Sequence, residues 1–388
     1  MSSHSANFFD VIIIGVGSMG SSACYHLAKL GNKVLGLEQF TISHEFGSHA
    51  GQSRIIRKAY FEHSDYVPLL IRAYENWKSL EQESGEQLYF KTGLVYFGPR
   101  DHLVMKGVNQ SASLYGIELE NLNHAEIRKR FPQFNIPENF QCLFEPDAGF
   151  VRPEKTIQLY AELARKNGAQ INSNEKVLEW KKNGNGILVK TDKNNYHCNK
   201  LVITAGAWAG KMIPGFEKKL KITRQFVSWI KPNNETKFSF GKFPCWLLAD
   251  DEKQGVYYGF PSLPTEKFGQ PAGLKLAHHH AAIETDPDHV NRNPTTADED
   301  NLKFELNKYF PGVFESFLTE KICLYANTPD ENFIIDKLPG YEDHVAIACG
   351  FSGHGFKFVP VVGEILSDFI IDGKTKFSME FLSAKRFN

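Results

Sequence analysis

The chain has 388 residues, of which 42% are hydrophobic, and its formal net charge is −1. This length predicts two domains, or one large domain with a second lobe, and a core of substantial size. The balanced charge argues against nucleic acid or an anionic membrane surface as a partner. No run of about 18 apolar residues is present, so we expect no membrane-spanning helix.

The cysteines and the two ends of the chain bear on the compartment. The six cysteines are far apart and form no C-x-x-C pair, a pattern that fits neither a zinc site nor a disulfide scaffold. The first residues, MSSHSANFFD, lack the basic and apolar regions of a signal peptide. The last three residues are not a peroxisomal signal of the S-K-L type. We therefore expect a cytoplasmic protein.

The clearest motif lies within the first 38 residues. The apolar run Val11–Ile14 is typical of a central parallel strand, and a second apolar run, Val34–Leu37, ends in Glu38. Between them an amphipathic helix is predicted, with a glycine after its end. Its apolar face comprises Met19, Ala23, Leu27 and Leu30, and the glycine after it is Gly31. The spacing predicts a βαβ unit.

Three glycines in G-x-G-x-x-G spacing open this helix and make the unit a dinucleotide-binding fingerprint. Gly15 permits a tight turn, Gly17 lets the backbone approach a pyrophosphate, and Gly20 lets the helix pack closely on the strand. The helix N-terminus offers free N–H groups and a partial positive charge to the phosphates. Glu38 can accept hydrogen bonds from a ribose. The motif alone fits NAD and FAD equally.

Two later segments are predicted to join the same sheet. Leu201–Trp208 is a strand that runs into a turn of small residues, and His344–Gly350 is another strand. Gly353 and Gly355 then precede a helix that extends to about residue 371. This glycine pair fits an ordinary strand-to-helix turn as well as a helix N-terminus that stabilises a reduced, anionic flavin.

A sheet built from the first, middle and last parts of the chain predicts interleaved domains. We assign residues 1–90, 148–221 and 327–388 to a Rossmann-like α/β domain that binds the dinucleotide. Residues 91–147 and 222–326 are rich in aromatic residues with alternating patterns, which favours a mostly antiparallel sheet in a substrate domain.

Five separate segments, in this order, resemble the monomeric sarcosine oxidase family, whose relatives include N-methyltryptophan oxidase and pipecolate oxidase. They are Gly51–Tyr60, Tyr257–Ser262, Gly273–Leu276, Cys323–Asp336 and Gly350–Lys357. The resemblance implies a D-amino-acid-oxidase-like fold and a monomer. It also implies FAD-dependent oxidation of the C–N bond of a secondary amino acid by O2, which yields an imine and hydrogen peroxide. The imine then hydrolyses.

The resemblance also implies that FAD is bonded covalently, through a thioether, to Cys323. Taken alone, a single cysteine is more often a small buried hydrophobe, and we interpret Cys349 in that way. The fingerprint and the resemblance together predict the cofactor-binding residues. They are Gly15, Gly17, Ser18, Met19, Gly20, Glu38, His49, Arg54, Val177, Ala205, Gly206, Trp208, Cys323, Gly353, His354, Gly355, Phe356 and Lys357.

Four residues are implied to be catalytic by the same resemblance: Lys275, Arg54, His279 and Tyr258. Lys275 would stabilise the anion formed when oxygen takes an electron, and Arg54 would lie against the flavin. Alternation along a strand places Lys275 and His279 on one face. The alternative for Lys275 is a solvated lysine that points outward.

Arg57 and Lys357 are implied to bind the substrate carboxylate, with Tyr258 also in contact with the substrate. Without the resemblance, a charged surface turn would be the better interpretation of residues 54–58. We also expect the segment 243–248 to shape the substrate pocket, with Trp246 narrowing it. Ala50 stands where relatives often have a second histidine, which puts that histidine's role in substrate binding in doubt.

Three adjacent histidines, His278–His280, raise the question of a metal site. No cysteine or carboxylate is suitably spaced nearby, so we expect none. Three rival functions stay open. They are an FAD dehydrogenase that reduces a quinone or carrier protein, a non-catalytic FAD-binding module, and an NAD-dependent imine reductase.

Overall fold

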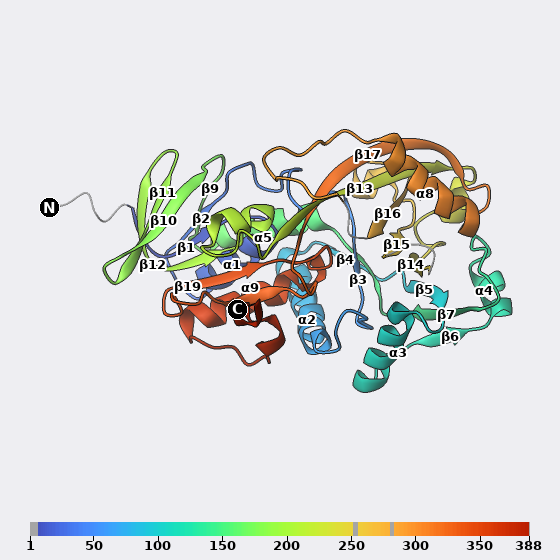
Figure 1. Ribbon diagram of the computed structural model, residues 1–388, viewed down its shortest axis with the longest axis horizontal. Coiled ribbons are helices and arrows are strands. Elements are labelled where there is room, and N and C mark those ends of the chain that lie inside the picture. Colours follow the sequence, from blue (N-terminus) through green and yellow to red (C-terminus); the bar gives the residue numbers. More distant parts are fainter. Residues whose placement is uncertain (1–6, 251–254, 280–282, 388) are drawn as a thin grey trace.

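A computed structural model describes residues 7–250, 255–279 and 283–387, which form two lobes side by side (Figure 1). The first lobe is built on an eight-stranded sheet with parallel central strands. Strand β1 (Phe8–Ile14) lies between β2 (Val34–Leu37) and β12 (Asn195–Ile203), and β12 also pairs in parallel with β19 (Val345–Cys349). The prediction of one sheet built from the first, middle and last parts of the chain is confirmed.

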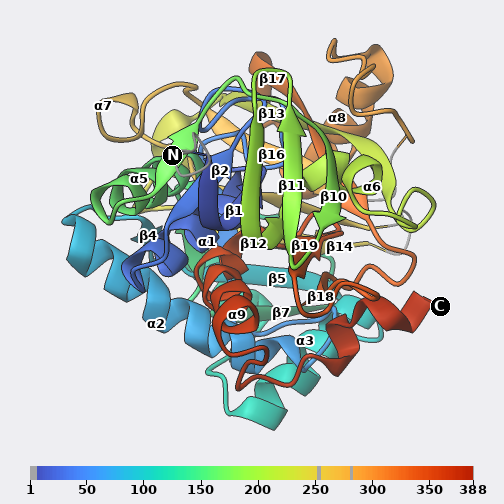
Figure 2. The ribbon, with the colours of Figure 1, turned by 90° about the vertical axis from the view of Figure 1, so that its left-hand side faces the viewer.

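Four further strands extend this sheet. They are β9 (Gln170–Asn172) beside β2, β10 (Val177–Asn183) and β11 (Gly186–Thr191) beyond β12, and β18 (Ile334–Lys337) beside β19. Strands β10, β11 and β12 form an antiparallel ribbon (Figure 2).

Both faces of the central strands are buried, which explains their continuous apolar runs. Val11 and Ile13 pack toward helices α1 (Ser18–Lys29), α5 (Pro153–Lys166) and α9 (Val359–Ile371), and α1 contacts both α5 and α9. Ile12 and Ile14 pack into a second cluster on the opposite face. Helix α2 (Tyr66–Ser84) packs against α9.

The end of α1 corrects one expectation. Leu30 was predicted on the apolar face, but it follows the last helical residue and is 64% exposed. The helix stops there because Gly31 has a φ of +84°, a left-handed conformation that glycine adopts without strain.

The second lobe contains another eight-stranded sheet, in the order β17-β13-β16-β15-β14-β5-β7-β6. All pairs are antiparallel except that of β14 and β5, so the predicted mostly antiparallel sheet is confirmed. Its strands are β5 (Leu94–Pro99), β6 (Glu120–Leu122), β7 (Phe140–Glu145), β13 (Lys221–Pro232), β14 (Cys245–Ala249), β15 (Val256–Gly259), β16 (Leu274–His279) and β17 (Phe314–Asn327). Its helices are α3 (Leu103–Tyr115), α4 (His124–Arg130), α7 (Thr265–Phe268) and α8 (Thr296–Tyr309).

A small three-stranded sheet carries the segment that begins at Arg54. It consists of β3 (Arg54–Ile56), β8 (Gly149–Val151) and β4 (Tyr89–Phe90). Short helical segments complete the chain: η1 (Gly206–Trp208), α6 (Ala209–Met212), η2 (Glu235–Phe238), η3 (Phe356–Phe358), η4 (Glu380–Leu382) and η5 (Ala384–Phe387). The exact domain limits stay a prediction. Strands β13 and β17 each cross a predicted limit by one residue.

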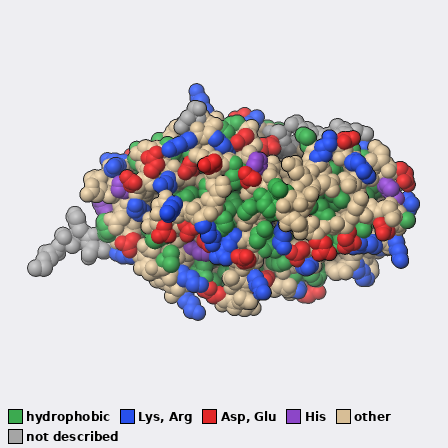
Figure 3. Space-filling model, turned by 90° about the horizontal axis from the view of Figure 1, so that it is seen from below, with side chains coloured by type: hydrophobic (Ala, Val, Ile, Leu, Met, Phe, Trp, Pro, Cys, Tyr) green, Lys and Arg blue, Asp and Glu red, His purple; other side chains and the backbone are tan. Residues whose placement is uncertain are grey.

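Acidic and basic side chains are intermixed on the molecular face shown in Figure 3. This distribution matches the formal net charge of −1. Within the described residues, no helix combines the length and apolar character needed to cross a bilayer.

Candidate active site

A long cavity extends from the glycine motif to the second lobe. From the first lobe, Gly15 and Glu38 line it, and from the second lobe, Leu247, Tyr258 and His279 do so. Most of the predicted cofactor residues are on its wall: Gly15, Gly17, Ser18, Met19, Glu38, His49, Arg54, Val177, Ala205, Gly206, Trp208, Gly353, His354, Gly355, Phe356 and Lys357. Of the predicted site residues, Gly20, Lys275 and Cys323 do not line this cavity.

The glycines of the motif differ in what surrounds them. A methyl group on Gly17 or on Gly206 would meet no atom within 4 Å, so the backbone at both positions faces open space in the cavity. A methyl group on Gly20 would lie 1.9 Å from the carbonyl oxygen of Gly15. The first pair therefore leaves room for a ligand, whereas Gly20 permits close helix–strand packing.

The loop before β3 brings three predicted residues together. Arg54 donates to the carbonyls of Ser48, Ala50 and Ser53. Lys275 Nζ donates to the carbonyls of Gly51 and Ser53 at 2.5 and 2.6 Å. Cys323 Sγ lies 3.5 Å from the Ala50 carbonyl oxygen. Lys275 and Cys323 thus lie beside the cavity, under the loop whose Arg54 lines it.

Lys275 is buried, with 1% of its surface exposed, so the alternative of a solvated lysine is wrong. Burial and then the charge of Arg54 hold the pKa of Lys275 well below its ordinary value. Leu274 and Leu276 pack into the core of the second lobe, whereas Ala277 packs with Cys323 on the other face of the strand.

Glu154, at the start of helix α5 in the first lobe, holds this loop in place. Its Oε1 accepts from the backbone N–H groups of Gly51 and Gln52 at 2.6 and 3.0 Å. Sequence reasoning missed Glu154. The acid lies in the first turn of a predicted helix, where a solvent-exposed acid is common, and its partners are about 100 residues away.

Arg57 is the first of two buried cations on the cavity wall. It is 3% exposed, which rules out the surface-turn interpretation at this position. Its Nη2 donates to both carboxylate oxygens of Glu62, at 2.6 and 2.8 Å, and its Nη1 donates to the Ala59 carbonyl. Burial alone would raise the pKa of Glu62, but the charge of Arg57 overcomes it and lowers that pKa. The guanidinium of Arg57 is therefore already paired with a carboxylate of the protein itself.

Lys357 is the second buried cation, at 4% exposure. Its Nζ donates to the His354 carbonyl at 2.6 Å and to the Tyr60 hydroxyl at 3.4 Å. Burial, followed by the charge of Arg57, lowers the pKa of Lys357 to about 7. The same end of the cavity thus holds both predicted carboxylate-binding residues together with Glu62, which was not predicted.

Tyr258 and His279 line the cavity from adjacent strands. His279 Nδ1 lies 3.3 Å from the hydroxyl of Tyr325, a cavity residue that was not predicted. Tyr258 packs against a cluster that includes Cys323 and Trp229. Aromatic rings therefore surround the end of the cavity in the second lobe.

A family model described as FAD dependent oxidoreductase matches residues 10–369. The chain belongs to this family. It is 37% identical to a monomeric sarcosine oxidase of Streptomyces avermitilis, over 97% of each chain. It is 35% identical to an N-methyl-L-tryptophan oxidase of Salmonella enteritidis, over 98% of this chain and 99% of that one.

Solved structures share the fold at lower identity. NikD, an unusual amino acid oxidase essential for nikkomycin biosynthesis, is 21% identical with a TM-score of 0.84, over 97% of this chain and 98% of that one. L-proline dehydrogenase from P. horikoshii is 23% identical with a TM-score of 0.82, over 97% of each chain. These likenesses confirm the predicted D-amino-acid-oxidase-like fold.

As expected for an FAD-dependent family, the cavity offers partners for a dinucleotide. Glu38, at the end of β2, accepts from the N–H groups of Val16 and Phe40, and burial raises the pKa of its carboxyl to about 7. His49 is 4% exposed, and its Nε2 has no hydrogen-bond partner within the described part of the chain. A buried polar atom on a cavity wall is satisfied most simply by a bound ligand. The residues present therefore fit FAD.

One expectation about a side chain near the cavity needs correction. Trp246 does not narrow the cavity: it is 2% exposed and packs against Phe310 in the core of the second lobe. Leu247, the next residue of β14, lines the cavity instead, because successive strand side chains face opposite sides. His278 stacks on Tyr257, with ring centroids 3.9 Å apart.

The question of a metal site concerns His278–His280, of which His280 lies outside the described residues. Within the described residues, no group of three or more His, Cys, Asp or Glu side chains is placed to hold a metal ion.

Proposed function

We propose that the protein oxidises the C–N bond of a secondary amino acid, such as sarcosine or another N-methyl or cyclic amino acid. The substrate loses a hydride from the carbon next to nitrogen and a proton from nitrogen. O2 takes both electrons and two protons and becomes hydrogen peroxide, and water hydrolyses the imine. The observation that carries this proposal is the pair of buried cations, Arg57 and Lys357, on the cavity that also holds the dinucleotide motif.

These two cations suit a carboxylate. The planar guanidinium of Arg57 can pair with both carboxylate oxygens, and Lys357 adds a point charge. Because Glu62 occupies Arg57, an incoming carboxylate would have to displace it or share the guanidinium with it. The surrounding aromatic rings would exclude water from a bound substrate, which would lower the pKa of its amine and favour the reactive neutral form.

Bound FAD would supply the two-electron acceptor for this oxidation. The motif glycines and the helix N-terminus of α1 would hold its pyrophosphate, and Glu38 its ribose. We further propose that Cys323 bonds to the flavin. Since Cys323 and Lys275 lie under the loop at Ala50–Ser53, their contact with a flavin would require this loop to shift.

Lys275 would serve oxygen reduction. Burial and the charge of Arg54 lower the pKa of Lys275, and an oxygen anion forming beside it would favour the protonated form, which would then stabilise that anion in a water-excluded site. The alternative dehydrogenase would have no need of this charge, because its electrons leave for a quinone or carrier protein.

Lys275→Met tests this role. We expect anaerobic bleaching of the flavin by amino acid to continue, while the rate of reoxidation by O2 falls by about 100-fold or more. Lys182→Met, an exposed residue of β10, is the matched control and should change neither rate. Equal loss of both half-reactions in Lys275→Met would contradict the assignment. Dye reduction without oxygen consumption in the wild type would favour the dehydrogenase, and a flavin that no amino acid bleaches would favour a non-catalytic module.

We also propose a cytoplasmic monomer. All six cysteines are buried and unpaired, which suits a reducing compartment. The monomeric state is carried by the family resemblance and is tested by sedimentation equilibrium.

A further inference from the structure

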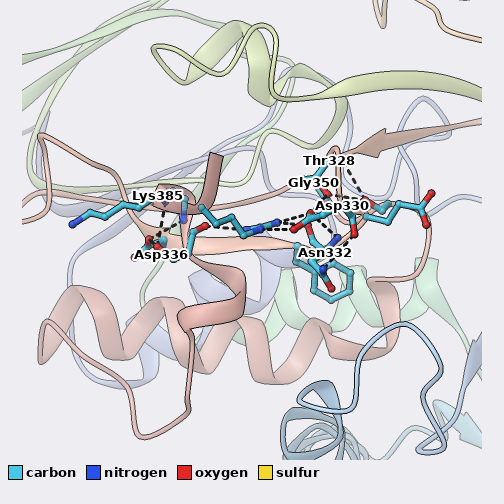
Figure 4. A network of polar contacts seen from close by, with 12 residues as sticks. Thr328, Asp330, Asn332, Asp336, Gly350 and Lys385 are labelled. Atoms are coloured by element: carbon cyan, nitrogen blue, oxygen red, sulfur yellow. Dashed lines mark hydrogen bonds and ion pairs between the residues drawn. The ribbon is translucent and has the colours of Figure 1, made fainter. Parts of the chain in front are cut away.

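The turn between β17 and β18 is held by an arginine from η5. Arg386 Nε and Nη2 donate to the two carboxylate oxygens of Asp330, at 2.8 and 3.1 Å. Its Nη2 also donates to the Asn332 carbonyl at 2.6 Å. Asp330 accepts in turn from Thr328 Oγ1 and from the Asn332 N–H. Figure 4 shows Thr328, Asp330 and Asn332 gathered at one end of this network.

The other end of the network fastens η5 to β18. Asp336 Oδ2 accepts from Ser383 Oγ at 2.7 Å and from the Ala384 N–H at 2.9 Å, beside Lys385 in Figure 4. Segment η5 is therefore anchored at both Asp330 and Asp336. This double anchor fixes the position of the Thr328–Asn332 turn relative to the sheet.

The inner side of the same turn contacts the active site. The Glu331 carbonyl oxygen lies 3.0 Å from His354 Nε2. A carbonyl oxygen can only accept, so Nε2 carries the hydrogen, and burial keeps the ring neutral by lowering the pKa of His354 to about 3. His354 Nδ1 must then accept the hydrogen bond from the Tyr60 hydroxyl, 2.6 Å away. The turn thus sets the tautomer of His354.

The direction of the Tyr60 hydroxyl hydrogen bond determines how Tyr60 contacts Lys357. Because the Tyr60 hydroxyl donates to His354, its oxygen lone pairs are left to accept from Lys357 Nζ at 3.4 Å. Lys357 Nζ also donates to the backbone carbonyl of His354. With two of its three N–H donors held in this way, the ammonium has one left for a ligand in the cavity.

We propose that Arg386 and Asp330 are positioning residues for the substrate carboxylate, acting through His354 and Tyr60 on Lys357. This inference rests on the proposed function, in which Lys357 binds that carboxylate. The side chains of Arg386 and Asp330 are 15% and 38% exposed, so solvent screens this pair more than it would a fully buried one, and Tm is measured beside KM for each variant. An effect on substrate binding is separated from an effect on stability by comparing the two measurements.

The experiment uses a double-mutant cycle in the flavin-loaded, full-length enzyme: Arg386→Ala, Lys357→Met and both together. We expect Arg386→Ala to raise KM for the amino acid about five- to tenfold, with kcat at saturation changed less than about twofold. In the Lys357→Met background, Arg386→Ala should change KM less than about twofold, because the residue it positions is gone. Additive effects would overturn the proposal, as would an unchanged KM in Arg386→Ala.

Two further variants guard against a general loss of structure. Asp330→Asn keeps one accepting oxygen and removes the charge, so its KM should rise in the same direction by a smaller factor. Arg386→Lys keeps the charge and should restore part of the loss. If the KM of Asp330→Asn and the KM of Arg386→Lys both equal the wild-type value, the proposal is wrong.

Arg224→Ala is the matched control. Arg224 donates to both oxygens of Asp298 and to the carbonyls of Asn291 and Asn293, which is the same fork in the second lobe. The Arg224→Ala variant should have a lower Tm and an unchanged KM for the amino acid. An equal rise of KM in this control would show that any lost arginine fork produces the effect, and would count against positioning.

A binding measurement separates this proposal from the proposed function. The Kd of propionate, an unreactive carboxylate, is measured by calorimetry for the wild type and the three variants of the cycle. The same non-additivity should appear in Kd. If it appears while the wild type oxidises no amino acid, the proposed oxidation fails and the positioning stands. If the wild type oxidises amino acids but the cycle is additive, the positioning fails alone.

Discussion

Replacing Lys357 with methionine removes a buried ammonium while keeping a side chain of similar length. Burial and the charge of Arg57 lower the pKa of Lys357 from 10.5 to about 7. At about 1.4 kcal/mol per pH unit, keeping this lysine charged in the folded state costs about 5 kcal/mol. The methionine variant avoids this cost but loses the hydrogen bonds of Lys357 to His354 and Tyr60, which contribute about 2 kcal/mol to stability. We therefore expect Lys357→Met to raise the free energy of unfolding by about 3 kcal/mol at pH 6.

The pH dependence gives the sign of this effect. The folded state disfavours the charged lysine, so the penalty is complete below pH 7 and fades as the pH rises toward the ordinary pKa of 10.5. The advantage of the methionine variant should therefore shrink above pH 7 and vanish near pH ~9, where the remaining penalty of about 2 kcal/mol equals the loss of the hydrogen bonds.

The measurement is urea denaturation at pH 6, 7.5 and 9, on preparations with equal flavin content. Lys182→Met is the control, because this exposed side chain should give a small difference that does not vary with pH. A Lys357→Met variant that is less stable at pH 6, or whose advantage is constant from pH 6 to 9, would refute the reasoning. Stability is gained at the expense of function, since KM for the amino acid should rise about tenfold or more.

Three other predictions concern the cofactor and the carboxylate site. Gly20→Ala should abolish FAD binding or folding, because its methyl group would lie 1.9 Å from the Gly15 carbonyl oxygen, and flavin absorbance of the purified protein measures this. Cys323→Ser should release its yellow colour into the supernatant on acid precipitation, whereas a coloured wild-type supernatant would contradict covalent attachment. Glu62→Gln should lower KM for the amino acid several-fold, because Arg57 loses its competing carboxylate. The same variant should lower the free energy of unfolding by about 3 kcal/mol. An unchanged KM would mean that Glu62 does not compete with the substrate.

The dinucleotide half of the fold could be predicted because its signals are local. The glycines, the helix and Glu38 are within 24 residues, and their spacing alone fixes a βαβ unit. Alternation along a strand likewise predicted that Lys275 and His279 share one face of β16. The same rule, applied to β14, would have placed Leu247 and not Trp246 on the cavity, had the facing side been known.

The carboxylate site could not be predicted from spacing because its residues are far apart in the chain. Arg57 and Lys357 are 300 positions apart and meet only through tertiary packing. The family resemblance supplied both. Glu62 escaped notice although it lies five residues after Arg57, because an acid close to a base in sequence is usually a solvated surface pair. Its burial, and not its position in sequence, makes it part of the site.

The order of strands in the first sheet has a consequence for biosynthesis. Strand β1 emerges from the ribosome first, yet its neighbour β12 begins nearly 190 residues later, and β19 is made only near the end of translation. Strand β1 can pair early with β2 on one edge, but its other edge must wait for β12, which is complete only when about half of the polypeptide has been synthesised. Because residues 350–357 also line the cavity, its wall is complete only after nearly the whole chain has been made, and the exposed β1 edge in the nascent chain is open to mispairing until β12 is made.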